Sequence, residues 1–318
     1  MNIKGLKSAV DKWPVAAVLG VSAHAFYRVY QHTFNVENEC TKMSFYGDLK
    51  TPLDTNTQAA VDKVIDKFLF IVSSKQLALT QFYWTKKPTV HYMGSSQSRF
   101  GTFIGLPVHF RYKHPSEVDL STIESKGLSK EENSELLQRL RESLVLSEEA
   151  KKFAISSEFF SAHSPHLIVK ANGILMAAGA YFTVKHLFLQ YFEAASPAAV
   201  FSILIGVALV WTVAHFWVSG VYYKNLRASS DRKTAQLGED FLQGGLEYLK
   251  KTLEKNKVLR ELDPSTATLM FKSNGDEIQG VLDIRAMSIS ERLNHLQKIE
   301  EKKQQMNDSS KVTLETSD

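Results

Sequence analysis

The hydrophobic and polar positions of the chain define one long apolar region with charged segments on both sides. Residues 198–220 contain no Asp, Glu, Lys or Arg, and about 20 apolar residues are enough to cross a bilayer core. Residues 167–189 are also apolar, with Lys170 and Lys185 near their ends, where long side chains can reach lipid headgroups. Only a short connector separates the two segments. The pattern therefore predicts a transmembrane helical hairpin over residues 167–220.

The charges beside this hairpin predict its orientation. The connector carries one Glu and no Lys or Arg, whereas both flanks are basic, with Lys151, Lys152, Lys224, Arg227, Arg232 and Lys233. Basic flanks stay on the cytosol-like or matrix-like side of a membrane. We therefore expect only the connector to cross.

The N-terminal segment 1–40 is predicted to be a targeting or membrane-associated segment. Residues 13–27 are apolar but short for a full span, and lysines alternate with apolar residues at helical spacing before them. This pattern fits an import presequence, a third span or a retained signal anchor. The sequence leaves open whether residues 13–30 span a membrane or are cleaved, and therefore on which side the following unit lies.

The segment 41–115 is predicted to form a small α+β soluble unit. Apolar residues recur at helical spacing over 55–73, and Asp54 is placed to cap that helix. Strand-like runs follow at 77–85, 89–93 and 102–112, rich in aromatic and β-branched residues and separated by Pro- and Gly-containing turns.

The remaining segments are predicted to be helical or charged. Residues 116–166 form a charged connector with a surface helix at 129–144 and a juxtamembrane helix at 148–160 that begins after Ser147. Residues 221–301 form a mainly helical region with one long helix over 231–262, and residues 302–318 form a disordered tail. The predicted fold class is therefore a membrane protein, with a transmembrane helical hairpin between a small α+β soluble region and a mainly helical region.

Four residues are candidates for contact with a partner. Gly105 and Pro107 interrupt an apolar strand, which indicates either a partner's approach to the backbone or a tight turn in a packed sheet. Gly244 and Gly245 are adjacent in a predicted helix, where each costs about 1 kcal/mol relative to alanine. Close packing against another helix would offset that cost.

The composition argues against several classes of function. A net charge of +4 gives no concentrated basic face for nucleic acid. A single cysteine, Cys40, excludes an internal disulfide and a paired-thiol site. His163 and His166 have a spacing that could hold a metal, but no further ligands complete a set, so interfacial histidines are the preferred interpretation. We predict no catalytic, cofactor-binding or metal-binding residues and no small-molecule substrate.

Several segments together resemble one family. They are RFGTFIGLPVHF (99–110), LSEEAKKFAISSE (146–158), the apolar region itself, DRKTAQL (231–237), GGLEYLKKTLEKNKVLREL (244–262) and KSNGDEI (272–278). In this order and spacing, covering most of residues 75–280, the chain resembles the transmembrane protein 177 family of the mitochondrial inner membrane.

The resemblance implies a non-enzymatic assembly factor. Such a factor stabilises newly made cytochrome c oxidase subunit II and its membrane chaperone during early maturation, so the expected partners are these two proteins and the lipid bilayer. It also implies a multi-pass protein of the mitochondrial inner membrane whose C-terminal region faces the matrix. The alternatives are a membrane-anchored enzyme with a site in residues 45–115 and, less favoured, a small transporter or channel subunit.

Overall fold

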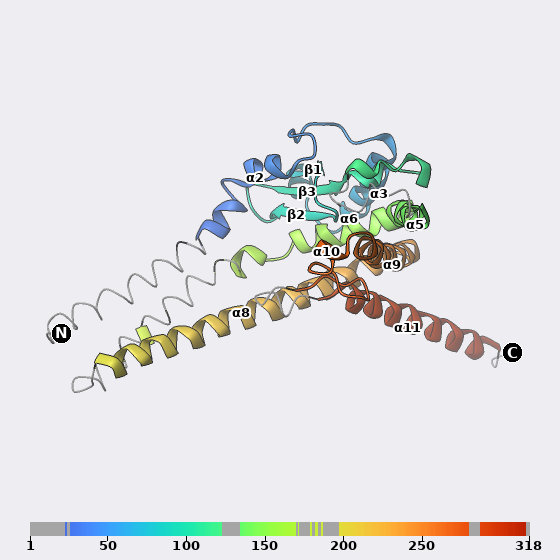
Figure 1. Cartoon of the computed structure of the whole chain (residues 1–318). Coiled ribbons are helices and arrows are strands. Elements are labelled where there is room, and N and C mark those ends of the chain that lie inside the picture. The colour runs from blue at the N-terminus through green and yellow to red at the C-terminus, as the bar shows by residue number, and fades with distance from the viewer. Residues whose placement is uncertain are drawn as a thin grey trace.

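The described residues form a mixed fold, mainly helical, around a small sheet. The computed structural model describes residues 26–122, 134–169, 197–279 and 287–315, together with positions 23, 171, 179, 182, 183 and 186. The sheet lies on one side of the body and the longest helices lie on the other (Figure 1). Two of these helices, α8 (Pro197–Ala235) and α11 (Ile289–Glu315), extend from the body in opposite directions.

The sheet has three strands in the order β1-β3-β2. Strand β1 (Thr80–Thr85) pairs in parallel with β3 (Thr102–Pro107), from Thr80 opposite Thr102 to Thr85 opposite Pro107. Strand β2 (His91–Gly94) pairs with β3 in the antiparallel direction. All six residues of β3 are buried, as expected for a central strand covered on both faces.

Short helices surround this sheet. They are α2 (Val36–Met43), α3 (Thr55–Phe68), α4 (Ser74–Ala78) and the 3-10 turns η1 (Val108–Arg111), η2 (Pro115–Glu117) and η3 (Leu120–Thr122). The expected start of α3 is confirmed, because the Asp54 side chain accepts hydrogen bonds from the backbone N–H groups of Asn56 and Thr57. The three expected strands are confirmed in shorter form. Residues 77–78 belong to α4, and η1 replaces the strand after Pro107.

The centre of the body is helix α6 (Glu148–Ala162), which packs against the sheet, α3, α8 and α9 (Glu239–Leu262). Its predicted start is confirmed, since Ser147 Oγ accepts a hydrogen bond from Ala150 N. Nearly every side chain of α6 is buried. The main hydrophobic core runs from Val61 of α3 through Phe153 of α6 to Leu296 of α11, so segments far apart in sequence share it. Helices α5 (Ser134–Leu144) and α10 (Pro264–Ala267) pack on α9.

The predicted transmembrane helical hairpin at 167–220 is wrong. In the described parts of the chain, no helix combines the length with the apolarity that a bilayer crossing needs. Its second predicted span is not a separate element, because it is the first part of α8, which continues to Ala235 and ends among buried polar residues. The apolar composition of residues 198–220 does not indicate that the helix continues to Ala235. Most of the first predicted span, 167–189, and most of 13–30 lie outside the described residues.

Two further predictions for the C-terminal region are wrong. The single helix expected over 231–262 is divided, because α8 ends at Ala235 and Gly238 lies in extended backbone immediately before α9. The tail expected to be disordered from residue 302 continues α11 as far as Glu315. Its Lys, Gln and Met residues favour helix, and the preceding turns have already met the cost of nucleation.

We predict opposite effects of alanine at two helical glycines. A Cβ at Gly244 would lie 2.1 Å from the carbonyl oxygen of Glu149, whereas a Cβ at Gly206 meets nothing within 4 Å. Gly244→Ala should lower the free energy of unfolding by about 1–3 kcal/mol through overpacking. Gly206→Ala should leave it unchanged or raise it by up to about 1 kcal/mol. Urea unfolding of the two variants checks this, and equal midpoints would contradict the close approach of α9 to α6.

Candidate functional site

Helix α6 buries charged side chains that neighbouring helices must neutralise. Lys152 is 7% exposed, and its Nζ lies 2.5 Å from Asp240 Oδ2 of α9. Glu158 is 6% exposed and forms an ion pair with Arg227 of α8. An unpaired buried charge costs several kcal/mol. The position of α6 therefore depends on these contacts with α8 and α9.

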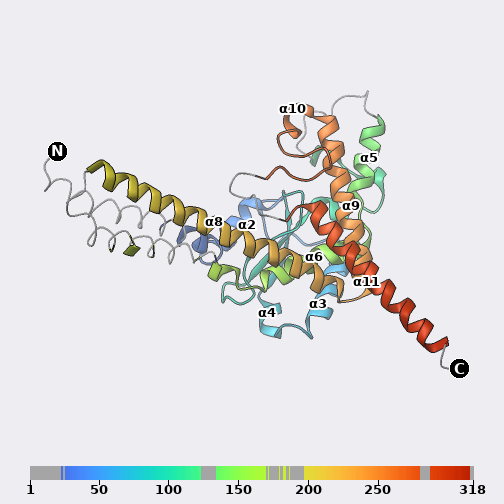
Figure 2. The same ribbon diagram turned by 90° about the horizontal axis from the view of Figure 1, so that it is seen from below.

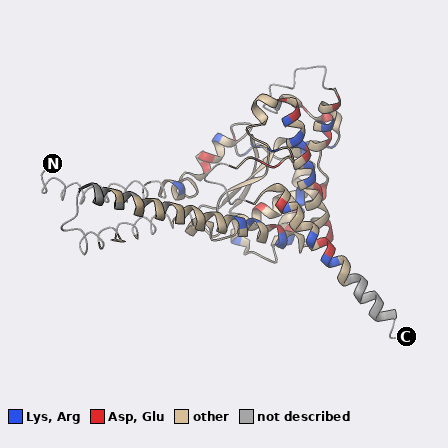
Figure 3. Cartoon of the chain, turned by 60° about the horizontal axis from the view of Figure 1, so that its bottom comes forward, with Lys and Arg blue, Asp and Glu red and all other residues tan. Residues whose placement is uncertain are grey.

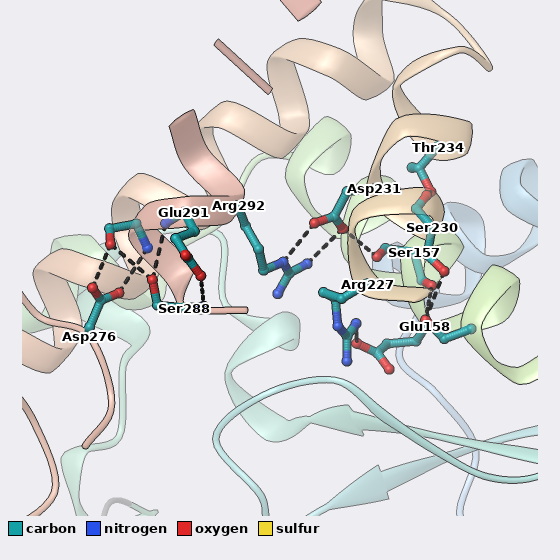
Figure 4. A network of polar contacts seen from close by, with 12 residues as sticks. Ser157, Glu158, Arg227, Ser230, Asp231, Thr234, Asp276, Ser288, Glu291 and Arg292 are labelled. Atoms are coloured by element: carbon teal, nitrogen blue, oxygen red, sulfur yellow. Dashed lines mark hydrogen bonds and ion pairs between the residues drawn. The ribbon is translucent and has the colours of Figure 1, made fainter. Parts of the chain in front are cut away.

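A third ion pair joins α8 to α11 in the same region (Figure 4). Arg292 of α11 donates to both carboxylate oxygens of Asp231, from Nε at 2.7 Å and from Nη2 at 2.8 Å. Ser157 of α6 donates to Asp231 Oδ1 at 2.7 Å. Three helices thus meet at one carboxylate, which is fully buried. Burial favours a higher pKa for Asp231, but Arg292, with smaller contributions from the charge of Arg227 and the hydrogen bond of Ser157, outweighs it and holds the pKa below its usual range.

The end of this helix junction is hollowed into a groove of about 520 Å³ between α6 and α8. One wall of the groove carries Asn225, Ser229 and Lys233, which are spaced four residues apart on one face of α8. The side chain of Lys233 is exposed. Within the described residues no carboxylate forms an ion pair with it.

The opposite wall of the groove is largely apolar. It is formed by Phe160 of α6, Pro165 beyond its end, and Ile71 from the turn between α3 and α4. Lys233 Nζ lies 5.9 Å from the centre of the Phe160 ring. Burial, followed by the positive charge of Lys233, lowers the pKa of His163, which also lines the groove. The groove thus has one apolar wall, and Lys233 gives the other wall a positive charge.

The two histidines considered for a metal site both have hydrogen-bond partners in the structure. His163 Nδ1 lies 2.8 Å from Ser96 Oγ, and His166 Nε2 lies 2.9 Å from the carbonyl oxygen of Gly94. Among the described residues, no group of three or more His, Cys, Asp or Glu side chains could hold a metal ion. These contacts connect the C-terminal end of α6 and the residues after it to the end of β2 and the turn that follows.

The four residues considered for partner contact lie in the interior. Gly105 and Pro107 belong to the buried strand β3, and a Cβ at Gly105 would lie 2.4 Å from His91 Cε1. Gly244 packs on the backbone of α6, and Gly245 packs on Phe153. The two adjacent glycines therefore pack closely against another helix, as inferred, and that helix is α6 of the same chain. Their contact with a partner stays a prediction.

Other polar groups near the sheet also contribute to packing. Cys40 is fully buried, and burial raises the pKa of its thiol to about 12. The hydroxyl of Tyr83 lies 3.0 Å from His91 Nε2, and burial, followed by the charge of Lys87, lowers the pKa of His91 to about 4. Tyr83 is 1% exposed, so this pair in the 45–115 unit faces the interior of the fold.

Sequence reasoning missed the groove and the network beside it. Both depend on contacts between residues far apart in the chain, such as Ser157 with Asp231 and Asp231 with Arg292. The available signal is the polar segment after residue 220, from which the sequence predicts only a basic flank and the start of the helix over 231–262. Residues 69–71 fall inside the helix predicted over 55–73, whereas in the structure they follow the end of α3 at Phe68.

We predict that replacing both residues of the buried Asp231–Arg292 pair preserves most of the stability, whereas replacing Asp231 alone lowers it. Asp231→Leu leaves the Arg292 charge buried without its partner and should cost about 3–5 kcal/mol in the free energy of unfolding. The double variant Asp231→Leu with Arg292→Leu should recover most of that loss, because neither charge is then buried. Chemical unfolding of the two variants measures both values.

The control is an exposed pair between the same two helices. Lys224 Nζ lies 2.9 Å from Glu291 Oε1, with both side chains almost half exposed. Lys224→Gln should change the free energy of unfolding by less than about 1 kcal/mol. A similarly small effect of Asp231→Leu would show that the buried pair does not hold α11.

Comparison with known proteins places the chain in a family. Residues 80–313 match the family model described as Transmembrane protein 177. A protein named Transmembrane protein 177 from Danio rerio is 29% identical over 188 residues, which are 55% of this chain and 58% of that protein. Its namesake from Rattus norvegicus is 28% identical over 191 residues, or 58% of this chain and 59% of that protein.

A third relative, also named Transmembrane protein 177, comes from Xenopus laevis and is 25% identical over 185 residues. The chain thus spans less than two thirds of the length of the curated relatives that it matches. No solved structure matches the chain. The family model covers more than half of the chain, including α6, α8, α9 and most of α11, and the chain therefore belongs to the transmembrane protein 177 family.

Proposed function

We propose that this protein is a non-enzymatic assembly factor of the mitochondrial inner membrane. In this role it stabilises newly made cytochrome c oxidase subunit II and its membrane chaperone during early maturation. The observation that carries the proposal is family membership across residues 80–313, which include the buried ion pairs and all of the groove lining except Ile71. The name of the family, Transmembrane protein 177, supports association with a membrane. The C-terminal region is proposed to face the matrix.

The surface of α8 supports a role in holding an apolar client. Figure 3 shows that the part of α8 projecting from the body carries few charges, whereas α9 and the start of α11 carry many. Leu209, Val210 and Val213 on this part are 59–67% exposed. Apolar side chains that project together from a body are typical of surfaces that bind other apolar segments. A newly made membrane subunit presents such segments before it is assembled.

The test is recovery of partners with the full-length tagged chain. We expect purification from mitochondria in a mild detergent to recover cytochrome c oxidase subunit II and its chaperone, identified by mass spectrometry. In cells without the protein, pulse-labelled subunit II should disappear faster than in control cells. Recovery of the protein in mitochondria without these partners, together with an unchanged lifetime of subunit II, would overturn the proposal.

A matched pair of variants tests whether α8 makes the contact. Leu209→Asn with Val213→Asn replaces two exposed residues one turn apart on α8 and should reduce the recovery of subunit II at least about tenfold, the effect of losing a few kcal/mol of interface. The control, Leu269→Asn with Met306→Asn, replaces two residues that are 70–76% exposed elsewhere on the body. Equal losses from both variants would place the contact outside α8.

A further inference from the structure

A protruding apolar turn lies beside the groove. Leu69, Phe70 and Ile71 follow the end of α3, and Phe70 is 92% exposed, the largest exposed fraction among the described large hydrophobic residues. Leu69 and Ile71 are 52% and 42% exposed. The turn is fixed at its base, since Val72 is buried in the main core and Ser73 caps α4. The three consecutive apolar side chains of Leu69–Ile71 are thus exposed to solvent, while the residues that follow them are packed in the core or cap a helix.

Lysines lie on both sides of this turn. Lys67 and Lys75 are exposed on either side of it, with Asp66 as the neighbouring acidic residue. Ile71 also lines the groove, and so does Lys233, which brings a third lysine to the same face. Ile168, whose backbone N–H donates to the carbonyl oxygen of the groove residue Pro165, is 72% exposed.

The size of this face favours a lipid surface over a protein partner. A stable protein interface buries about 800 Å² on each side, whereas this face consists of a three-residue turn and a narrow groove. Binding to an anionic membrane surface needs only a few apolar side chains that enter the headgroup region and basic residues around them. The turn with its flanking lysines has that composition. Lys233, Ser229 and Asn225 line the adjoining groove with groups that can donate hydrogen bonds to a phosphate.

We propose that this face docks on the surface of an anionic phospholipid bilayer. Leu69–Ile71 enter the interface, and Lys233 with Ser229 and Asn225 holds a lipid phosphate in the groove. The proposal rests on the membrane location given under the proposed function and adds a specific contact between the body and anionic lipid. It places Lys67, Lys75 and Lys233 at the headgroups.

A fluorescent probe on the turn tests the proposal with the full-length chain. The variant Leu69→Cys accepts a thiol-reactive NBD label, because the native Cys40 is fully buried. The labelled protein is mixed with phosphatidylcholine vesicles that contain or lack phosphatidylglycerol. We expect NBD emission to rise at least about twofold and shift to the blue on the anionic vesicles, as a polar probe does when it leaves water for the interface.

The matched control is an exposed leucine on another face of the body. Leu269 is 76% exposed and follows α10, which lies on the opposite side of the body from α3 and α4 (Figure 2). Leu269→Cys with the same label should show no change on either kind of vesicle. Flotation of the vesicles measures in parallel how much protein is bound, so the probe signal is compared at equal binding.

Charge variants test the basic part of the face. Each lysine near an anionic surface strengthens binding about fivefold, so neutralising Lys67, Lys75 and Lys233 to Gln should weaken docking on the order of 100-fold. The Leu69 signal on anionic vesicles should then fall to its level on neutral vesicles. The control neutralises Lys113, Lys250 and Lys272, three exposed lysines that do not line the groove, and should keep the signal.

Several results would overturn the proposal. One is that the Leu69 probe stays in water while the protein floats with anionic vesicles, or that the protein does not bind them at all. Another is that the probe changes without lipid as the protein concentration rises, which would identify a second copy of the chain as the occupant. A change that requires added subunit II would identify the client instead. Each of these results can occur whether or not subunit II is recovered from mitochondria, so failure of the docking proposal can be distinguished from failure of the proposed function.

Discussion

The whole structure depends on the burial of α6 on nearly every side. A helix in this position cannot turn its charged residues to water, so Lys152 and Glu158 need partners from α9 and α8. Ser157 of α6 also donates a hydrogen bond to Asp231 of α8, and Asp231 forms an ion pair with Arg292 of α11. The sheet on one side and three helices on the other are thus fixed to one central element. Its polar contacts set the positions of α8 and α11.

This arrangement explains why small residues and a groove occur where they do. Gly244 lets α9 approach the backbone of α6, and Ser147, which precedes α6, donates to Glu247 of α9. At its other end α6 ends at Ala162, and α8 continues past it, which leaves the groove lined by Phe160 and Lys233. The groove proposed to hold a lipid and the part of α8 proposed to contact a client therefore lie at the edge of the helices packed around α6.

Local features of the fold were predictable from the sequence, whereas features made by distant contacts were not. The caps Asp54 and Ser147 mark helix starts because capping depends on neighbouring residues. The break at Gly238 and the buried polar end of α8 depend on tertiary packing, so apolarity alone predicts the wrong hairpin. The same reason applies to the candidate site. The adjacent glycines indicated close helix packing correctly, but no local pattern indicates that Lys233 and Ile71 share a groove.

The most direct test of this account is native-state hydrogen exchange of the full-length chain. The account predicts that backbone amides of α6, of residues 221–235 in α8 and of residues 289–299 in α11 open together, with similar free energies close to that of global unfolding. Uniform protection across these three segments would show that the buried ion pairs join them into one unit. Exchange in residues 289–299 that is orders of magnitude faster than in α6 would show that α11 opens independently, and would contradict the account.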